Sequence, residues 1–344
     1  MTVMNLPVRS ASAADGEPAG ASPLSTQRTL ARELVHRAAL AEVFLTDFAS
    51  HGEQAFSAAA QLPPAHLYYG DHTDPRAGHD PLAVFESVRQ MLLCAMHLQH
   101  DAPSGSKSIT ATAGLEITDP APLRGSGPLD LDLRGSVALS KEYRGTVSRV
   151  VHQVEVLVAG APVGRITVDT AQRPDEVYQQ LRMSHRESVP PSSDILSAHT
   201  GGRPVPARLV AREVAANVVL EEARIEADGV VARLRVPVAH PSMFDHAQDH
   251  VPGPVMMEAA RQSSLLLAAT HLGLAPERLR LSAMDAEYLR FAELDSPIAV
   301  LTRQVADEGS APVATEVVFE QEGSAVARMR VRLSARELEV GDAI

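Results

Sequence analysis

The sequence has a single cysteine, Cys94, among 344 residues. One cysteine can form neither an internal disulfide nor a thiolate cage for a metal ion, so its scarcity indicates a protein of a reducing compartment. Positive charge is also scarce, because 31 Lys and Arg stand against 43 Asp and Glu and leave a formal net charge of −12. This acidic balance, with no run of basic residues, disfavours a nucleic-acid-binding groove.

Long apolar runs and several common catalytic motifs are missing as well. The first 25 residues contain no apolar core of a signal peptide, and the longest nearly apolar stretch, 265–275, is too short to span a bilayer. Neither a Gly-x-Ser-x-Gly motif nor a Walker-type phosphate loop occurs, which disfavours a serine hydrolase and a P-loop enzyme. We therefore expect a soluble, acidic, cytoplasmic protein without a bound cofactor.

Composition divides the chain into four segments. Residues 1–27 are rich in Ala, Ser, Gly and Pro, and this composition predicts a disordered leader. A second stretch rich in Pro and Gly, 183–206, predicts a linker. Two domains of similar length, 28–182 and 207–338, remain on either side of it.

The two domains carry matching segments in the same order. Residues 84–93 align without a gap with 256–265, so that Glu86, Arg89 and Gln90 coincide with Glu258, Arg261 and Gln262. Later, 160–168 aligns with 323–331 as a turn glycine followed by an alternating strand. Two matches in one order favour an internal duplication.

Both domains have the same expected order of strands and helix. A hairpin is predicted from 217–225 and 230–238 around Asp228-Gly229, with a weaker counterpart ending in 56–62. Helices are expected at 254–271 and 81–97, each with few charges, followed by strands of period two. The pattern predicts an α+β fold of two hotdog domains, each an antiparallel sheet wrapped around one central helix.

The candidate site centres on the second helix. Glu258, Arg261 and Gln262 share one helical face near the positive end of the helix dipole. Backbone N–H groups around Gly253 could polarise a carbonyl oxygen, and a desolvated carboxylate could act as a base, which together suit acyl transfer. A Glu–Arg pair that only satisfies itself is the alternative, and its repetition at Glu86 and Arg89 argues against that alternative.

Histidines gather ahead of both helices, and among them are His240 and His250. Their spacing matches no tight ligand pattern, so we predict no metal site and assign them to loop capping or substrate orientation. Cys94 lies in the middle of the first helix and is expected in the core.

These motifs resemble a known family. The second domain contains His240-Pro241, residues 249–253 with the sequence Asp-His-Val-Pro-Gly, residues 258–262 with the sequence Glu-Ala-Ala-Arg-Gln, and residues 290–294. Together with 35–37, His66, 79–82 and 86–90 in the first domain, they resemble the A-factor biosynthesis family of tandem hotdog proteins over residues 30 to 335.

The resemblance implies an acyltransferase that joins a β-ketoacyl group from an acyl carrier protein to dihydroxyacetone phosphate. Such a reaction is an early step toward γ-butyrolactone, butenolide or furan signalling molecules. Acyl chain length, final signal class, oligomeric state and the number of reacting half-sites stay open. We expect no nucleic acid or membrane partner.

The resemblance also suggests roles for the residues. Glu258 is the first choice of base and Glu86 the second, while Arg261 or Arg89 would hold the phosphate. The remaining residues expected to bind substrate are Gln90, Gln262, His240, His250 and Gly253. Arg328, Arg330 and Arg332 could help to dock an acidic carrier, or could simply form the solvated face of a strand.

Two other functions fit the same motifs. A hotdog thioesterase or dehydratase would use the same histidine and glutamate without needing the paired arginines. A non-catalytic module that binds an acyl ligand would need no turnover at all.

Overall fold

The computed structural model describes residues 9–10, 24–99, 107–143, 146–184, 186–196, 201–307, 309 and 311–335. Most of the predicted leader, 1–8 and 11–23, lies outside the described residues, as do 197–200 of the predicted linker. The chain forms two compact units. Unit 1 comprises Met1–Ala65 and Leu82–Pro190, and unit 2 comprises His66–Pro81 and Pro191–Ile344. The segment His66–Pro81, which sequence analysis placed in the first domain, thus belongs to the second unit.

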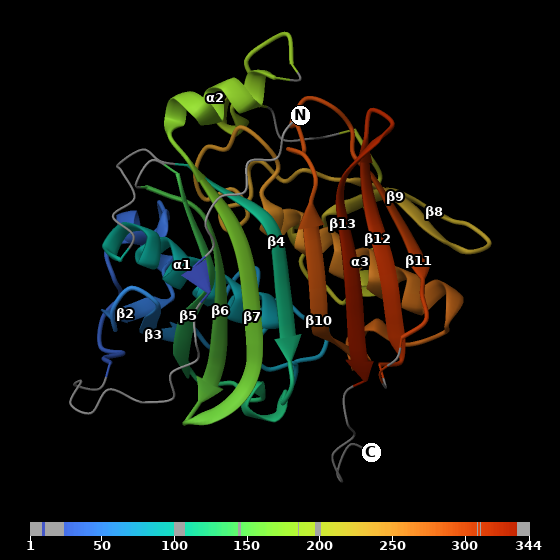
Figure 1. Cartoon of the computed structure of the whole chain (residues 1–344). Coiled ribbons are helices and arrows are strands. Elements are labelled where there is room, and N and C mark those ends of the chain that lie inside the picture. Colours follow the sequence, from blue (N-terminus) through green and yellow to red (C-terminus); the bar gives the residue numbers. More distant parts are fainter. Residues whose placement is uncertain are drawn as a thin grey trace. The chain divides into compact units, whose positions relative to one another are not determined.

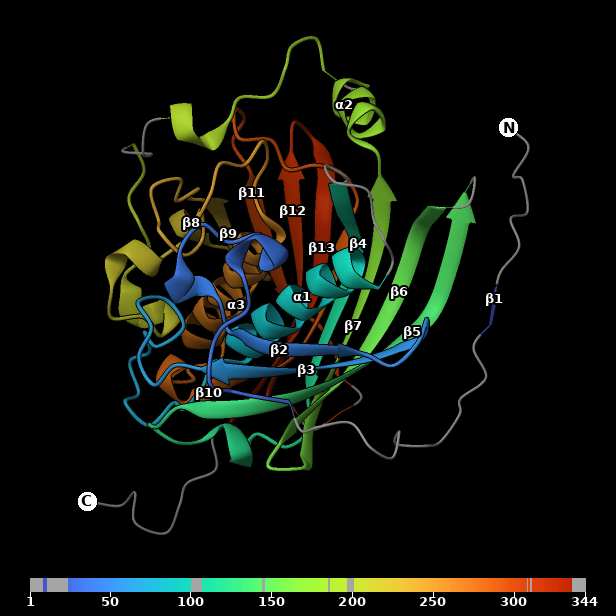
Figure 2. The same ribbon diagram turned by 90° about the vertical axis from the view of Figure 1, so that its left-hand side faces the viewer.

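Unit 1 is an antiparallel sheet with a central helix, and its elements are coloured blue to green in Figure 1. The strand order is β2-β3-β5-β6-β7-β4, and the short strand β1 (Arg9–Ser10) pairs with β5. The strands are β2 (Leu45–Ser50), β3 (Ala55–Leu62), β4 (Lys107–Ile117), β5 (Leu129–Tyr143), β6 (Thr146–Val158) and β7 (Ala161–Arg173). Helix α1 (Pro81–Leu98) follows β3, and α2 (Asp175–Met183) follows β7. Figure 2 shows α1 lying in the curve of this sheet.

Unit 2 repeats this arrangement with the same topology. Its strand order is β8-β9-β11-β12-β13-β10, and α3 (Gly253–His271) follows the first two strands as α1 does in unit 1. The strands are β8 (Leu220–Ile225), β9 (Gly229–Leu234), β10 (Leu279–Tyr288), β11 (Ala299–Gln304), β12 (Val313–Gln321) and β13 (Ser324–Ala335). The predicted hairpin, helix and alternating strand of this domain are therefore confirmed, with bounds that differ by a few residues.

The β6–β7 and β12–β13 turns of the two units have matching backbone conformations. The β6–β7 turn has Ala159 and Gly160 at φ of 50° and 81°, and the β12–β13 turn has Glu322 and Gly323 at 52° and 73°. Two consecutive residues with positive φ form the tight turn that suits the right-handed twist of a hairpin. The matched glycines of the sequence repeat thus occupy the same conformation in each unit.

The core of each unit lies between its helix and its sheet. Fourteen residues of α3 are buried, and they contact β9, β10, β11, β12 and β13. The alternation predicted for β13 is confirmed, because Ala327, Met329, Val331 and Leu333 are buried. None of the helices in the described part of the chain is long and apolar enough to cross a membrane.

Candidate active site

Helix α3 begins where the backbone approaches an aromatic ring closely. Pro252 precedes the helix in an extended conformation, and Gly253 is its first residue. A Cβ atom at position 253 would lie 2.9 Å from the Tyr288 hydroxyl oxygen and 3.0 Å from the ring carbon that bears it. Only glycine fits there without a shift of the ring, and the Gly253 N–H precedes the first intrahelical bond.

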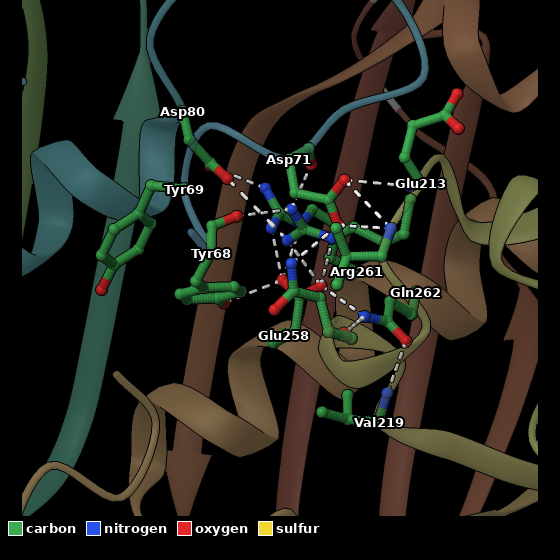
Figure 3. Close-up of polar contacts among 12 residues, drawn as sticks. Tyr68, Tyr69, Asp71, Asp80, Glu213, Val219, Glu258, Arg261 and Gln262 are labelled. Atoms are coloured by element: carbon green, nitrogen blue, oxygen red, sulfur yellow. Dashed lines mark hydrogen bonds and ion pairs between the residues drawn. The ribbon is translucent and has the colours of Figure 1, made fainter. Parts of the chain in front are cut away.

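One turn further along, Glu258 is the centre of a buried polar network (Figure 3). Its Oε1 accepts hydrogen bonds from Arg212 Nη2 at 2.8 Å and Nε at 3.1 Å, and from Gln262 Nε2. Its Oε2 accepts from the Tyr68 hydroxyl at 3.0 Å and from Arg261 Nε at 3.0 Å and Nη2. Six donors therefore surround a carboxylate that offers about four lone-pair sites.

Arg212 ties the His66–Pro81 segment to this network. Its Nη1 donates to the carbonyl oxygens of Tyr68 and Asp71, and its guanidinium carbon lies 5.0 Å from the centre of the Tyr68 ring. The Asp71 carboxylate in turn accepts from the backbone N–H groups of Glu213 and Val214. Arg212 and the two residues that follow it therefore hold the His66–Pro81 segment in place.

Arg261 has two acidic partners. Besides Glu258, its Nη1 donates to Asp80 Oδ1 at 2.6 Å. All three of its nitrogens have carboxylate partners, and its side chain is only 10% exposed. This arginine is consequently neutralised in place and has little capacity left for a further anion.

Gln262 links the network to the residues that precede strand β8. Its Oε1 accepts from Val219 N at 2.9 Å, and its Nε2 donates to the Asn217 carbonyl at 2.7 Å. The Asn217 side-chain oxygen lies 2.7 Å from His240 Nε2, while His240 Nδ1 accepts from the N–H groups of Ser242 and Met243. His240 and Gln262 therefore hold the loop structure around the site.

The electrostatics of the network favour the charged form of Glu258. Burial alone would raise its pKa, but Arg212 and then Arg261 outweigh burial and lower it. Burial, followed by the charge of Glu258, raises the pKa of Tyr68 well above its ordinary value. Tyr68 therefore stays a neutral hydroxyl that donates to an ionised carboxylate.

Unit 1 contains a similar cluster around Glu86. Its carboxylate accepts from Arg37 Nη2 at 2.6 Å, from Arg89 Nε at 2.8 Å and from Gln90 Nε2 at 2.8 Å. Burial would raise the pKa of Glu86, but Arg37 and Arg89 lower it to about 2. Gln90 bonds to Phe44 N and the Glu42 carbonyl, just as Gln262 bonds to Val219 N and the Asn217 carbonyl.

The two clusters differ in how accessible their arginines are. Arg89 is 29% exposed and donates to Glu86 through Nε and Nη2, while its Nη1 has no partner among the described residues. Arg261, by contrast, has all its nitrogens engaged. Of the two arginines that the sequence suggests for a phosphate, Arg89 is the more available.

His250 lies on the loop that leads into α3. Its Nδ1 is 2.6 Å from Asp249 Oδ1, and its ring contacts Phe291 edge-on at 5.1 Å between centroids. Among the described residues, no three His, Cys, Asp or Glu side chains converge as metal ligands. The buried Cys94 has its pKa raised to about 12 by burial.

Sequence reasoning missed several members of the unit 2 network, namely Tyr68, Asp71, Asp80, Arg212 and Asn217. For Arg212 the duplication itself carries a signal. Leu34-Val35-His36-Arg37 and Leu209-Val210-Ala211-Arg212 share three of four residues, and His36 and Ala211 both have positive φ after a short 3-10 helix. This third repeat places Arg37 and Arg212 at equivalent positions beside Glu86 and Glu258.

The duplicated sheet-and-helix units define a double hotdog protein. A pyran synthase domain from module nine of the sorangicin pathway matches with a TM-score of 0.52 at 14% identity, covering 86% of this chain and 98% of that domain. A protein of Lactobacillus plantarum described as an oleoyl thioesterase matches with a TM-score of 0.50 at 11% identity, covering 84% and 99%. At these identities the likeness concerns the fold.

Sequence comparison narrows this class to one family. The model of the A-factor biosynthesis hotdog domain matches residues 19–172 and 196–336, and the chain belongs to that family. A 2-oxo-3-(phosphooxy)propyl 3-oxoalkanoate synthase of Streptomyces virginiae is 32% identical over 275 residues, which cover 78% of this chain and 85% of the relative. Synthases of the same name from Streptomyces coelicolor and Streptomyces griseus are each 30% identical, covering 85% and 86% of this chain and 88% and 92% of the relatives.

Proposed function

We propose that this chain is an acyltransferase that joins a β-ketoacyl group, delivered as an acyl carrier protein thioester, to dihydroxyacetone phosphate. The observation that carries the proposal is the 30–32% identity, over most of the chain, to synthases named for the resulting ester. The ester would feed γ-butyrolactone, butenolide or furan signals. A cytoplasmic location, where both substrates are made, is part of the proposal.

Acyl transfer to an alcohol makes three demands on the site. The thioester carbonyl needs hydrogen-bond donors where negative charge develops, and the phosphate of the acceptor needs a cation. The attacking hydroxyl must also lose a proton to a base. No covalent intermediate with the protein is needed, which suits a chain whose one cysteine is buried with a raised pKa.

The N-terminus of α3 suits the carbonyl. The Gly253 N–H has no partner among the described residues, and the Tyr288 hydroxyl packs against the Cα of Gly253. The helix dipole adds to the attraction for a developing oxyanion. Gly253 is accordingly proposed as the carbonyl-binding residue of unit 2.

Arg89 suits the phosphate better than Arg261 does. Its exposed guanidinium keeps one nitrogen for a further acceptor, whereas Arg261 is bound by Glu258 and Asp80. Glu86 and Gln90 hold Arg89 and the surrounding backbone in place. We therefore propose Arg89 as the anion-binding residue of unit 1, held in position by Glu86 and Gln90.

The experiment is an incubation of the purified protein with a β-ketoacyl carrier thioester, with and without dihydroxyacetone phosphate, followed by mass spectrometry. A phosphorylated ester that appears only with the phosphate substrate supports the proposal. Free acid in both tubes would favour the thioesterase alternative, and intact thioester in both would favour a binding module.

A further inference from the structure

Asp249 and His250 form a hydrogen-bonded pair three residues before Gly253. The distance from His250 Nδ1 to Asp249 Oδ1 is 2.6 Å. A carboxylate can only accept, so Nδ1 carries the hydrogen and donates it. In the neutral ring Nε2 is then unprotonated and able to accept a proton.

The His250 ring is held in place and still accessible. Phe291 contacts it edge-on, and the neighbouring Val251 N–H donates to the Ala292 carbonyl at 2.8 Å. The His250 side chain is 29% exposed, and its Nε2 has no partner among the described residues. A substrate hydroxyl can therefore reach this nitrogen.

Three other histidines of unit 2 lack such a nitrogen. His240 uses Nε2 toward Asn217 and Nδ1 toward backbone N–H groups. His246 contacts Gln248 and Asp245, and His271 contacts the Glu226 carbonyl and Thr270. His250 thus differs from these three in having one nitrogen bound to a carboxylate and the other open.

Glu258 is poorly arranged to take a proton. Six donors already occupy its two oxygens, it has no exposed surface, and its arginine partners lower its pKa. A base must have a lone pair within reach of the proton that it removes. The geometry gives Glu258 the task of positioning Arg212, Arg261 and Tyr68 instead.

We propose that His250 is the general base of acyl transfer and that Asp249 is a positioning residue that fixes its tautomer. The inference rests on the proposed function. His250 Nε2 removes the proton from the acceptor hydroxyl while the oxygen forms a bond to the thioester carbonyl carbon. The C–S bond then breaks, and the proton on Nε2 passes to the departing thiolate, so the products are the ester and the free carrier thiol.

In the other half of the duplication, His79 and Asp80 lie near the corresponding place, but shifted by one residue. When Glu86 is aligned with Glu258, the position of His250 is occupied by Gly78. The proposal therefore assigns proton transfer to the α3 side of the duplication.

The test is chemical rescue of His250→Ala. Removing a general base costs about 10²- to 10⁴-fold in rate, and we expect ester formation to fall by that range while the melting temperature is preserved. Added imidazole should raise the rate of ester formation by His250→Ala at least tenfold, because the position is 29% exposed and imidazole can enter it. Ester is measured by mass spectrometry, since imidazole alone converts the thioester to free acid.

His271→Ala, at the far end of α3, is the matched control and should keep wild-type activity with no response to imidazole. Asp249→Asn should lower kcat about tenfold with little change in KM. The Asp249→Asn, His250→Ala double variant should be rescued as well as the single one, because free imidazole needs no orienting partner. If His250→Ala does not fold, His250→Asn replaces it.

Ester formation by His250→Ala at the wild-type rate, or a loss that imidazole does not restore, would overturn this proposal and leave the proposed function standing. Absence of ester with the wild-type protein would overturn both.

Discussion

In the network around Glu258, two buried arginines form ion pairs with two carboxylates. Arg212 and Arg261 face Glu258 and Asp80, and all four side chains are at most 10% exposed. Such an arrangement gains little over an apolar core, but removing one charge leaves an uncompensated partner in a medium of low polarity. Glu258 is therefore a stability determinant whatever its role in catalysis.

Glu258→Gln should lower the free energy of unfolding by about 3–5 kcal/mol, because two buried guanidinium groups lose their shared counter-charge. Urea denaturation measures the change. The control is Glu316→Gln, which breaks the exposed pair with Arg303 and should cost at most about 1 kcal/mol. Equal effects of the two variants would contradict the structure of the network.

His72 makes the stability of the protein depend on pH. Burial, and then the charges of Arg280, Arg212 and Arg261, lower its pKa from 6.5 to about 3, while Asp74 acts in the opposite direction. Below pH 6.5 His72 is therefore protonated in the unfolded chain, whereas in the folded chain it stays neutral down to about pH 3. Stability from this group is complete above pH 6.5 and declines as the pH falls through that window.

The wild-type protein should consequently lose up to about 2 kcal/mol more than His72→Gln when the pH drops from 7 to 5. Urea denaturation of both proteins at the two pH values gives the difference. The control is His51→Gln, which replaces an exposed histidine of unit 1 and should change the stability at the two pH values as little as possible relative to the wild type. Parallel pH dependence of the wild type and His72→Gln would show that His72 is not a buried neutral group.

At the scale of elements, the first residue of α3, Gly253, packs closely against the Tyr288 side chain. Gly253→Ala should push the Tyr288 ring aside, because the new Cβ would lie 2.9 Å from its hydroxyl oxygen. We expect a destabilisation of about 1–3 kcal/mol and, since a displacement near 1 Å can cost about 100-fold, a loss of activity of that order.

The double variant Gly253→Ala, Tyr288→Phe tests the cause of that loss. The Tyr288 hydroxyl has no hydrogen-bond partner among the described residues, so Tyr288→Phe alone should be nearly neutral in thermal unfolding. In the Gly253→Ala background it should recover part of the stability, because the closest contact is removed. A strictly additive pair would refute the steric explanation.

Local spacing explains which elements and site residues could be predicted. Glu258, Arg261 and Gln262 lie three and four apart on one helix, so their shared face follows from helical geometry. The helix and strand patterns likewise follow from periodicity. Arg212, Tyr68 and Asp80 come from 46, 190 and 181 residues away, and no local pattern specifies such contacts.

At the scale of the whole molecule, duplication conserved the framework while the two sites diverged. Both units keep one strand order, one helix position and the Glu, Arg, Gln and second Arg of the buried cluster. Unit 2 adds the His66–Pro81 segment, which encloses Glu258 with Tyr68 and Asp80. That segment precedes α1 in the chain. A division of the sequence into two consecutive domains therefore assigns it to the first domain, although it packs with the second unit.

The arginines suggested for carrier docking belong to a mixed surface. Arg330 lies opposite Asp285 on β10 and Glu316 on β12, and Arg328 lies opposite Glu287. Opposite charges across neighbouring strands offset each other. This placement favours the interpretation of Arg328 and Arg330 as part of a solvated strand face.

If the chain is an acyltransferase, the thioester is consumed by transfer to dihydroxyacetone phosphate and not by hydrolysis. The most direct measurement is the rate of carrier thiol release, followed with a thiol-reactive dye, as a function of dihydroxyacetone phosphate concentration. The buried Cys94, the one cysteine of the chain, has its pKa raised to about 12 and should contribute little background. We predict a rate near zero without the phosphate substrate that rises to saturation as it is added. Thiol release at the same rate with and without dihydroxyacetone phosphate would contradict the account.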